Sequence, residues 1–306
     1  MKRIVGIVGG MVLVLMAANT INAQGCSDAG FCTIDSFKPN NQKEDSASAP
    51  KNQVKVGASY GDADRGIIAI GSYVEYNRSL SKRWGLDLKL TALSQSGNDI
   101  SVFGLSDVFV NANYQAAKNL KFTLGGKIPL TDGNRTKDGL PLPMDYQSSL
   151  GTFDLLLGIG YQIVGVQLVA AIQQPLTQNN NQFLAETYDP MSPLVGWQST
   201  NNYQRAGDML LRISYPFNIG EKLKITASLL PIYHFANDKY TDAFGVEKEI
   251  ANSEGLTLNW NAYVDLMANK NSTLQFNLGS PIIIRKARPD GLTRSLIMTL
   301  EYRIRF

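Results

Sequence analysis

The last thirteen residues, 294–306, read RSLIMTLEYRIRF, and their side chains alternate in character from one position to the next. Successive residues of a β-strand point to opposite faces, so the pattern predicts a strand with two different faces. One face would carry Leu296, Met298, Leu300, Tyr302, Ile304 and Phe306. The other would carry Ser295, Thr299, Glu301, Arg303 and Arg305. A strand of this kind is typical of a sheet that separates lipid from water.

A strand that ends on an aromatic carboxy-terminus resembles the closing strand of bacterial outer-membrane β-barrels. In those proteins the strand also serves as the signal for assembly. The resemblance therefore implies the barrel-assembly machinery as a partner of the strand ending in Phe306, and outer-membrane lipid as the surroundings of its apolar face.

The same two-residue period recurs along the chain, and its clearest other copy is residues 256–267, LTLNWNAYVDLM. We count about twelve such segments, each close to the ~9 to 11 residues that a tilted strand needs to cross the hydrocarbon. They are residues 54–60, 66–80, 84–95, 102–115, 120–130, 152–164, 166–176, 205–217, 222–235, 254–267, 272–284 and 293–306.

The connections between these segments alternate between short and long. The short ones are 81–83, 116–119, 165, 218–221 and 268–271, and those between them are 61–65, 96–101, 131–151, 177–204, 236–253 and 285–292. Short periplasmic turns and long outer loops are what a barrel requires, and an even strand number leaves both chain ends in the periplasm. The loop 177–204 is too long for a passive connection, and we expect it to fold over the pore mouth.

The predicted fold class is therefore all-β: a transmembrane antiparallel β-barrel of about twelve strands. Closure follows from backbone physics, because an open sheet edge in lipid would leave unpaired peptide groups that cost several kcal/mol each. The alternative is an exported β-sandwich. Long strands argue against it, as do aromatic residues at the strand ends, which suit interfacial girdles. Those residues are Trp84, Tyr114, Tyr161, Tyr215, Tyr233 and Tyr302.

The amino-terminal region divides into two parts before the barrel, which spans residues 52–306. Residues 1–23 combine Lys2 and Arg3 with a short apolar run and small residues, a pattern typical of a secretory signal peptide. Residues 24–51 read as a periplasmic tail or a small plug. No later segment is apolar over the ~18 residues that a spanning helix needs, which excludes a helical membrane protein. A signal peptide followed by a barrel predicts an outer-membrane location in a Gram-negative bacterium.

Cys26 and Cys32 are the two cysteines of the chain, and both follow the predicted signal peptide. Export to an oxidising compartment favours a disulfide between them over a metal site. The alternative is lipidation of Cys26, although Ala23 occupies the position where a lipobox has a larger apolar residue. A net charge of +3 over 306 residues gives no reason to expect a nucleic-acid partner.

The polar face of each strand should line the lumen, which is where functional residues belong. The candidates are Glu75, Asp87, Lys89, Asp107, Lys121, Lys127, Asp154, Asp208, Arg212, Lys224, His234, Asp265, Glu301 and Arg303. Because both charge signs are mixed, we expect weak ion selectivity. The alternative is that these groups simply pair with one another inside a narrow barrel.

Several inward positions are instead apolar or aromatic, which is unusual for a water-filled porin. They are Tyr73, Leu93, Phe109, Leu156, Leu210, Leu230, Ile232 and Tyr263. Such residues could form a path for a hydrophobic solute or a seat for a plug formed by residues 26–37. The sequence leaves both possibilities open.

His234, the single histidine, raises the question of catalysis. Outer-membrane phospholipases of similar strand number carry a serine two residues after their histidine, where this chain has Ala236. A catalytic base needs a nucleophile within reach. We therefore expect no enzymatic activity, no cofactor and no metal.

Three neighbouring segments resemble the family of outer-membrane transporters named after the meta-pathway of phenol degradation. They are residues 104–115 (GLSDVFVNANYQ), 126–131 (GKIPLT) and 150–161 (LGTFDLLLGIGY). The family places Gly directly after the Thr of the second segment, where this chain has Asp132 and then Gly133. The resemblance implies an exported barrel that lets small, often apolar or aromatic, compounds cross the outer membrane.

The expected function is a monomeric channel that passes small solutes passively, with selection by the lumen and the outer loops. The alternative is a non-conducting barrel that binds a partner at the surface or anchors a periplasmic complex through the tail at residues 24–51.

Overall fold

The computed structural model describes residues 31–39, 51–291 and 294–306. The predicted signal peptide at residues 1–23, Cys26 and most of the tail lie outside the described residues. Within the described part, no helix has the length and apolar character to cross a membrane.

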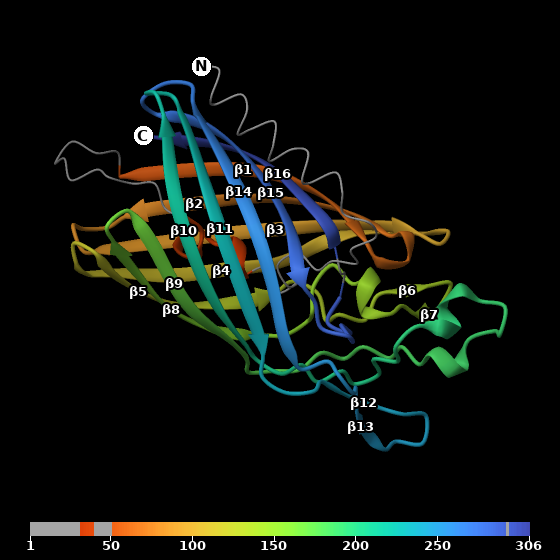
Figure 1. Cartoon of the computed structure of the whole chain (residues 1–306). Helices are drawn as coiled ribbons and strands as arrows, with labels where there is room; N and C mark the ends of the chain where they lie inside the picture. Colours follow the sequence, from red (N-terminus) through yellow and green to blue (C-terminus); the bar gives the residue numbers. More distant parts are fainter. Residues whose placement is uncertain (1–30, 40–50, 292–293) are drawn as a thin grey trace.

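The described residues form a closed antiparallel barrel of twelve strands, as predicted (Figure 1). The strands are β1 (Asn52–Ala63), β2 (Ile68–Ser79), β3 (Trp84–Gly97), β4 (Ile100–Ala117), β5 (Leu120–Pro129), β8 (Asp154–Ile163), β9 (Val166–Pro175), β10 (Asp208–Ile219), β11 (Leu223–His234), β14 (Gly255–Met267), β15 (Ser272–Ile283) and β16 (Arg294–Arg305). The chain closes where β1 pairs with β16, with Val56 opposite Tyr302. Closure satisfies the backbone groups that an open edge would leave unpaired in lipid.

The side chains of the closing strand alternate between exposed and buried positions, as its sequence predicts. Leu300 and Tyr302 are 52% and 44% exposed, whereas Glu301 and Arg303 are 1% and 7% exposed. A one-residue slip in register would exchange the two faces, so the apolar outer face fixes the pairing of each strand.

Aromatic side chains lie near both ends of the strands on the outer face. At the end with short turns, the ring centroids of Trp84 and Tyr114 are 4.8 Å apart and those of Tyr215 and Phe217 are 4.9 Å apart. Tyr233 lies on β11, close to the loop that follows it. Two bands of this kind suit the two interfaces of a bilayer.

The loops carry small elements of their own. These are η3 (Asp64–Gly66), β6 (Thr136–Lys137), β7 (Leu140–Pro141), η4 (Met144–Tyr146), η5 (Ala185–Thr187), η6 (Pro193–Gly196), β12 (Lys239–Thr241) and β13 (Glu247–Glu249). Ahead of the barrel, η1 (Phe31–Thr33) and η2 (Asp35–Phe37) form two short turns.

The predicted loop at 96–101 is wrong. β3 and β4 continue to Gly97 and from Ile100, and only two residues join them. Asn98 and Asp99 both have positive φ angles, 52° and 59°, which is the geometry of a type I′ hairpin turn and suits these residue types. The strands continue because Ile100 and Val102 are buried under the outer loops.

Candidate functional site

The structure places the predicted lumen residues on the inner face of the wall. Lys121 and Lys224 are half-buried, and the rest of the set is buried. They do not form one cluster, because they divide among contacts with the segment 31–39, pairs within the wall and a network at the outer end. The residues that contact the segment 31–39 are Glu75, Asp87, Lys89, Arg212 and Glu301, and Arg303 pairs with Glu301. Asp107, Lys127, Asp154 and Asp265 have partners elsewhere on the wall or in a loop, and Asp208 and His234 belong to the outer network.

Residues 31–39 lie inside the barrel, where the orange-red segment of Figure 1 is surrounded by strands. We call this segment the plug. Ser36 Oγ lies 2.5 Å from Asp87 Oδ2 and 2.6 Å from Asn113 Oδ1. Further along the wall, on β16, Glu301 Oε2 lies 2.9 Å from Lys38 Nζ.

The backbone of the plug is also held by cations of the wall. Lys89 Nζ donates to the carbonyl oxygen of Thr33 at 3.0 Å, and Arg212 Nη2 donates to that of Cys32 at 2.9 Å. Lys55 pairs with Asp35 of the plug. Hydrogen bonds to charged groups are stronger than those between neutral groups, so these contacts fix the plug in one position.

The apolar inward residues surround the plug. Ile34 and Phe37 are buried in one cluster with wall residues from several strands. Those wall residues include Phe109, Leu156, Leu210, Leu230 and Ile232. An added Cβ at Gly158 would lie 2.2 Å from Phe37 Cε1, so the wall has room for this ring only because residue 158 is glycine.

Cys32 is a buried residue of the plug. Its predicted disulfide partner, Cys26, lies outside the described residues. The disulfide therefore stays a prediction.

Other predicted lumen residues pair within the wall, away from the plug. Lys127 Nζ lies 2.9 Å from Asp154 Oδ2, and Gln275 donates to Asp265 at 2.7 Å. Asp107 accepts a hydrogen bond of 2.6 Å from Ser149. The Lys127–Asp154 pair corresponds to the alternative in which lumen charges satisfy one another, whereas Asp265 and Asp107 accept from neutral groups, the second from Ser149 of the 131–151 loop.

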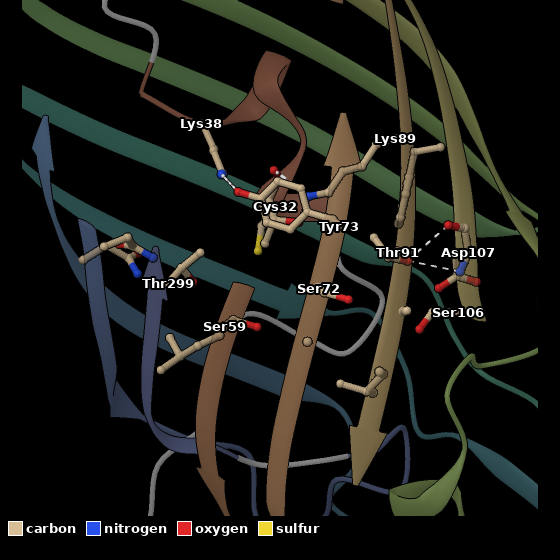
Figure 2. Close-up of a pocket in the computed structure, with 18 of the residues that line it drawn as sticks. Cys32, Lys38, Ser59, Ser72, Tyr73, Lys89, Thr91, Ser106, Asp107 and Thr299 are labelled. Carbon is tan, nitrogen blue, oxygen red and sulfur yellow. Dashed lines mark hydrogen bonds between the residues drawn. The ribbon is translucent and has the colours of Figure 1, made fainter. Parts of the chain in front are cut away.

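A cavity of about 130 Å³ lies in the lumen beside the plug (Figure 2). Cys32, Thr33 and Lys38 of the plug line one side, and Ser148 of an outer loop also borders it. The remaining lining comes from β1 to β4 and from β10, β11, β14, β15 and β16. It combines hydroxyl and amide groups with the side chains of Leu93, Phe109, Leu230 and Ile297.

The outer loops pack into a second apolar cluster, which we call the lid. Phe183, Leu194 and Trp197 of the 177–204 loop are buried against Tyr146 and against the ends of β1 to β4. Arg65 extends over the ring of Trp197 at 4.7 Å and donates to the carbonyl oxygen of Gly196 at 2.9 Å. The loop thus folds over the barrel end, as predicted.

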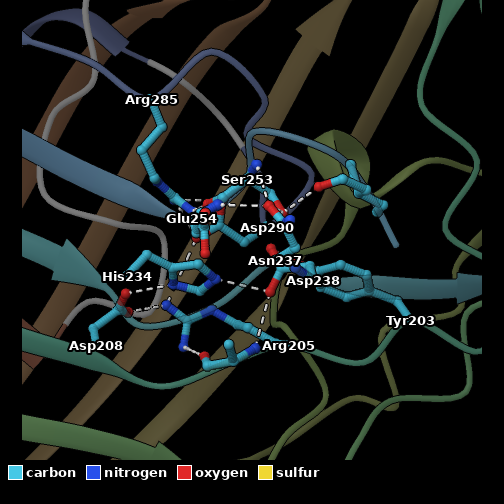
Figure 3. Close-up of polar contacts among 12 residues, drawn as sticks. Tyr203, Arg205, Asp208, His234, Asn237, Asp238, Ser253, Glu254, Arg285 and Asp290 are labelled. Carbon is cyan, nitrogen blue, oxygen red and sulfur yellow. Dashed lines mark hydrogen bonds and ion pairs between the residues drawn. The ribbon is translucent and has the colours of Figure 1, made fainter. Parts of the chain in front are cut away.

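His234 lies in a buried polar network at the outer end of the barrel (Figure 3). Its Nδ1 is 2.6 Å from Asp208 Oδ1 and its Nε2 is 2.8 Å from Asp238 Oδ1. A ring flanked by two carboxylates satisfies both only when both nitrogens carry protons. Neither ring nitrogen is available to activate a nucleophile, so His234 is not placed to act as a catalytic base.

The network extends to the loop that follows β15. Arg285 Nη2 lies 3.0 Å from both carboxylate oxygens of Asp290, and Arg205 pairs with Asp208. Burial alone would raise the pKa of Asp290, but Arg285 and Arg205 hold it below the ordinary value of 3.8. The network therefore ties three outer loops to the ends of β10 and β11.

Several of these residues were not among the sequence candidates. Lys55 was detectable, since it occupies an inward position of β1, two residues from Gln53 and Gly57. Asp35, Ser36 and Lys38 belong to a segment without periodicity, and Asp238, Arg285 and Asp290 lie in loops. No local pattern marks such residues, because their partners are distant in sequence.

Comparisons with known proteins find similarity at the level of structure. No protein-family model matches the chain, and no curated protein matches its sequence. An outer-membrane channel from Pseudomonas putida F1 is similar with a TM-score of 0.61 and 12% identity, over 88% of this chain and 100% of that one. The toluene transporter TbuX of Ralstonia pickettii gives a TM-score of 0.45 and 11% identity, over 94% and 100% of the two chains. At these identities the likeness shows the fold alone, which is that of outer-membrane β-barrels.

Proposed function

We propose that this protein is a passive outer-membrane channel for small, apolar or aromatic solutes. The observation that carries the proposal is a cavity in the lumen of a closed barrel, bordered by the plug and by an outer loop. A barrel built only as an anchor has no need of an internal cavity lined by Leu93, Phe109 and Leu230 together with hydroxyl groups.

The resemblance of residues 104–115, 126–131 and 150–161 to the phenol-degradation transporters supports the same solute class. The P. putida protein of similar fold is described as a channel, and the R. pickettii protein as a toluene transporter. No step of the proposed function is catalytic, since both ring nitrogens of His234 face carboxylates.

The plug is the element that we expect to move during transport. It is held by side-chain hydrogen bonds and ion pairs and does not belong to the sheet, so it can shift without breaking the ladders of the barrel. In the described state it narrows the lumen, so conduction requires its displacement.

The test combines conductance with uptake. In planar bilayers, we expect small and intermittent currents from the full chain and larger, steadier currents from a variant that lacks residues 24–51. Cells without the gene should take up small aromatic compounds more slowly than cells that carry it. Sealed barrels in both forms, with unchanged uptake, would refute the channel and favour the surface-binding or anchoring alternative.

A further inference from the structure

The charges that line the lumen cavity are unequal in number. Lys38, Lys89 and Arg212 contribute three cations, and Asp107 is the one acidic residue of the lining. Lys38 is compensated by Glu301 at 2.9 Å.

Lys89 is buried, and its ammonium group donates hydrogen bonds only to neutral groups. Its Nζ donates to the carbonyl oxygen and the Oγ1 of Thr33, at 3.0 and 2.7 Å, and lies 4.2 Å from the ring centroid of Tyr73. Its cross-strand neighbour Glu75 instead lies 3.7 Å from Lys55 Nζ and accepts from the backbone of Asp35. Among the described residues, no carboxylate lies within 4.0 Å of Lys89.

Arg212 is equally buried, with 1% of its surface exposed. One guanidinium nitrogen donates to the carbonyl oxygen of Cys32 at 2.9 Å and another to the hydroxyl of Tyr263, while Nε has no partner. In the described part of the chain, no carboxylate pairs with it either. Asp107, the acidic residue of the lining, accepts a hydrogen bond from Ser149.

A buried cation is costly unless it is paired, and a carboxylate is a stronger partner than a peptide carbonyl. Lys89 and Arg212 reach the carbonyls of consecutive plug residues, Thr33 and Cys32, so the two cations converge on one place. The plug therefore provides two neutral oxygens where one negative charge would be more favourable.

We propose that the cavity binds a small carboxylate with an apolar body, which competes with the carbonyls of Cys32 and Thr33 for Arg212 and Lys89. The body would lie against Leu93, Phe109, Leu230 and Ile297, which line the same cavity. A volume of about 130 Å³ is close to that of engineered cavities of ~150 Å³ that hold benzene. The inference rests on the proposed function and names its solute class. Binding would also release two of the contacts that hold the plug.

The experiment is calorimetric titration of the full chain, folded in detergent at constant ionic strength and pH 7, with benzoate and with benzyl alcohol. The two probes share a ring and differ in charge. We expect benzoate to bind about tenfold tighter or more, because hydrogen bonds between charged groups are the stronger ones. Arg212→Gln and Lys89→Gln should each remove most of that preference and leave the affinity for benzyl alcohol within about twofold.

The matched control is Lys121→Gln, which removes a half-buried inward lysine that does not line the cavity. It should retain the preference for benzoate, and circular dichroism should show unchanged strand content in every variant. Equal affinities for the two probes in the parent chain, or a preference that survives both cavity substitutions, would overturn the proposal. Uptake of neutral aromatic compounds without a preference for benzoate would end this inference and leave the channel. Arg212-dependent benzoate binding in a barrel that transports nothing would support this inference and refute the channel.

Discussion

Lys38 and Glu301, which are 263 positions apart in sequence, form an ion pair of 2.9 Å inside the barrel. The pair joins the plug to the closing strand β16. Glu301 also accepts a 2.5 Å hydrogen bond from Tyr73 and lies 2.9 Å from Arg303, so one carboxylate holds three partners together.

Substitution Glu301→Gln should loosen the plug. Breaking a buried ion pair costs about 3–5 kcal/mol because the remaining charge stays buried and unpaired. We expect larger and longer open-channel currents in planar bilayers than for the parent chain. The exposed Glu249 of β13 provides the control, and Glu249→Gln should leave the currents unchanged. Identical currents from parent and Glu301→Gln barrels would show that this pair does not hold the plug.

Substitution Gly158→Ala should displace Phe37, since an added Cβ would lie 2.2 Å from its ring. Overpacking of this kind costs about 1–3 kcal/mol. We expect the plug to move rather than the wall, because ladder hydrogen bonds hold the wall strands in place. The prediction is a higher conductance with unchanged strand content. Gly160→Ala on the same strand is the matched control, because an added Cβ there would lie 3.8 Å from its nearest neighbour, Lys121 Cε of β5. An equal effect of both substitutions would contradict the role of Phe37.

Substitution His234→Phe should open the outer loops. It leaves the carboxylates of Asp208 and Asp238 without their shared donor, at a cost of about 3–5 kcal/mol for a buried charge network. Hydrogen exchange should become faster in residues 236–253 and stay unchanged in the wall. The exposed Lys248 pairs with Asp242 on the surface, so Lys248→Met should have little effect. Unchanged protection in residues 236–253 would mean that the network does not hold this loop.

The lid should be more stable in acid than in base. Burial raises the pKa of Asp145 from 3.8 to about 7, partly opposed by Arg65. The folded lid therefore binds a proton that an opened lid releases, and its stability falls as the pH rises from about 4 to about 7. Tyr146 stacks on Trp197 with ring centroids 5.5 Å apart, so Trp197 reports on the lid.

Quenching of Trp197 by acrylamide, in a Trp84→Phe and Trp260→Phe background, should be stronger at pH 8 than at pH 5.5. Asp145→Asn should give weak quenching at both values, because the amide remains neutral. A pH dependence that persists in the Asn variant would show that a group other than Asp145 controls the lid.

The predicted disulfide can be tested by mass. The mature chain, unfolded without reductant, should incorporate no alkylating reagent at Cys26 or Cys32, and two equivalents after reduction. Alkylation without reduction would exclude the bridge, and a lipid-sized mass increase would identify the lipidated alternative.

The wall was predictable because lipid imposes one rule on every strand. Leu300 and Glu301 differ in exposure as their positions in the alternation require, and the same parity located Asp87, Asp265 and Arg212 on the inner face. The twelve-strand closure follows from that rule and from the cost of an open edge.

The contents of the lumen were not predictable in the same way. Whether Lys89 meets a carboxylate or a plug carbonyl depends on where residues 31–39 lie, and no period marks that segment. Asn98 and Asp99 form a tight turn, but the prediction placed a longer loop at 96–101. The strands extend up to this turn because Ile100 is buried against the lid, whose residues are distant in sequence. Asp238 and Ser253, which are joined by a 2.8 Å hydrogen bond, lie in a loop where no period marks the partners.

The lid and the plug have separate apolar cores. Phe183 and Trp197 pack with Ile67 and Ile100, and none of them belongs to the cluster around Phe37. Substitutions within the lid, at the face that antibodies and phages would meet, can consequently leave the packing around Phe37 in place.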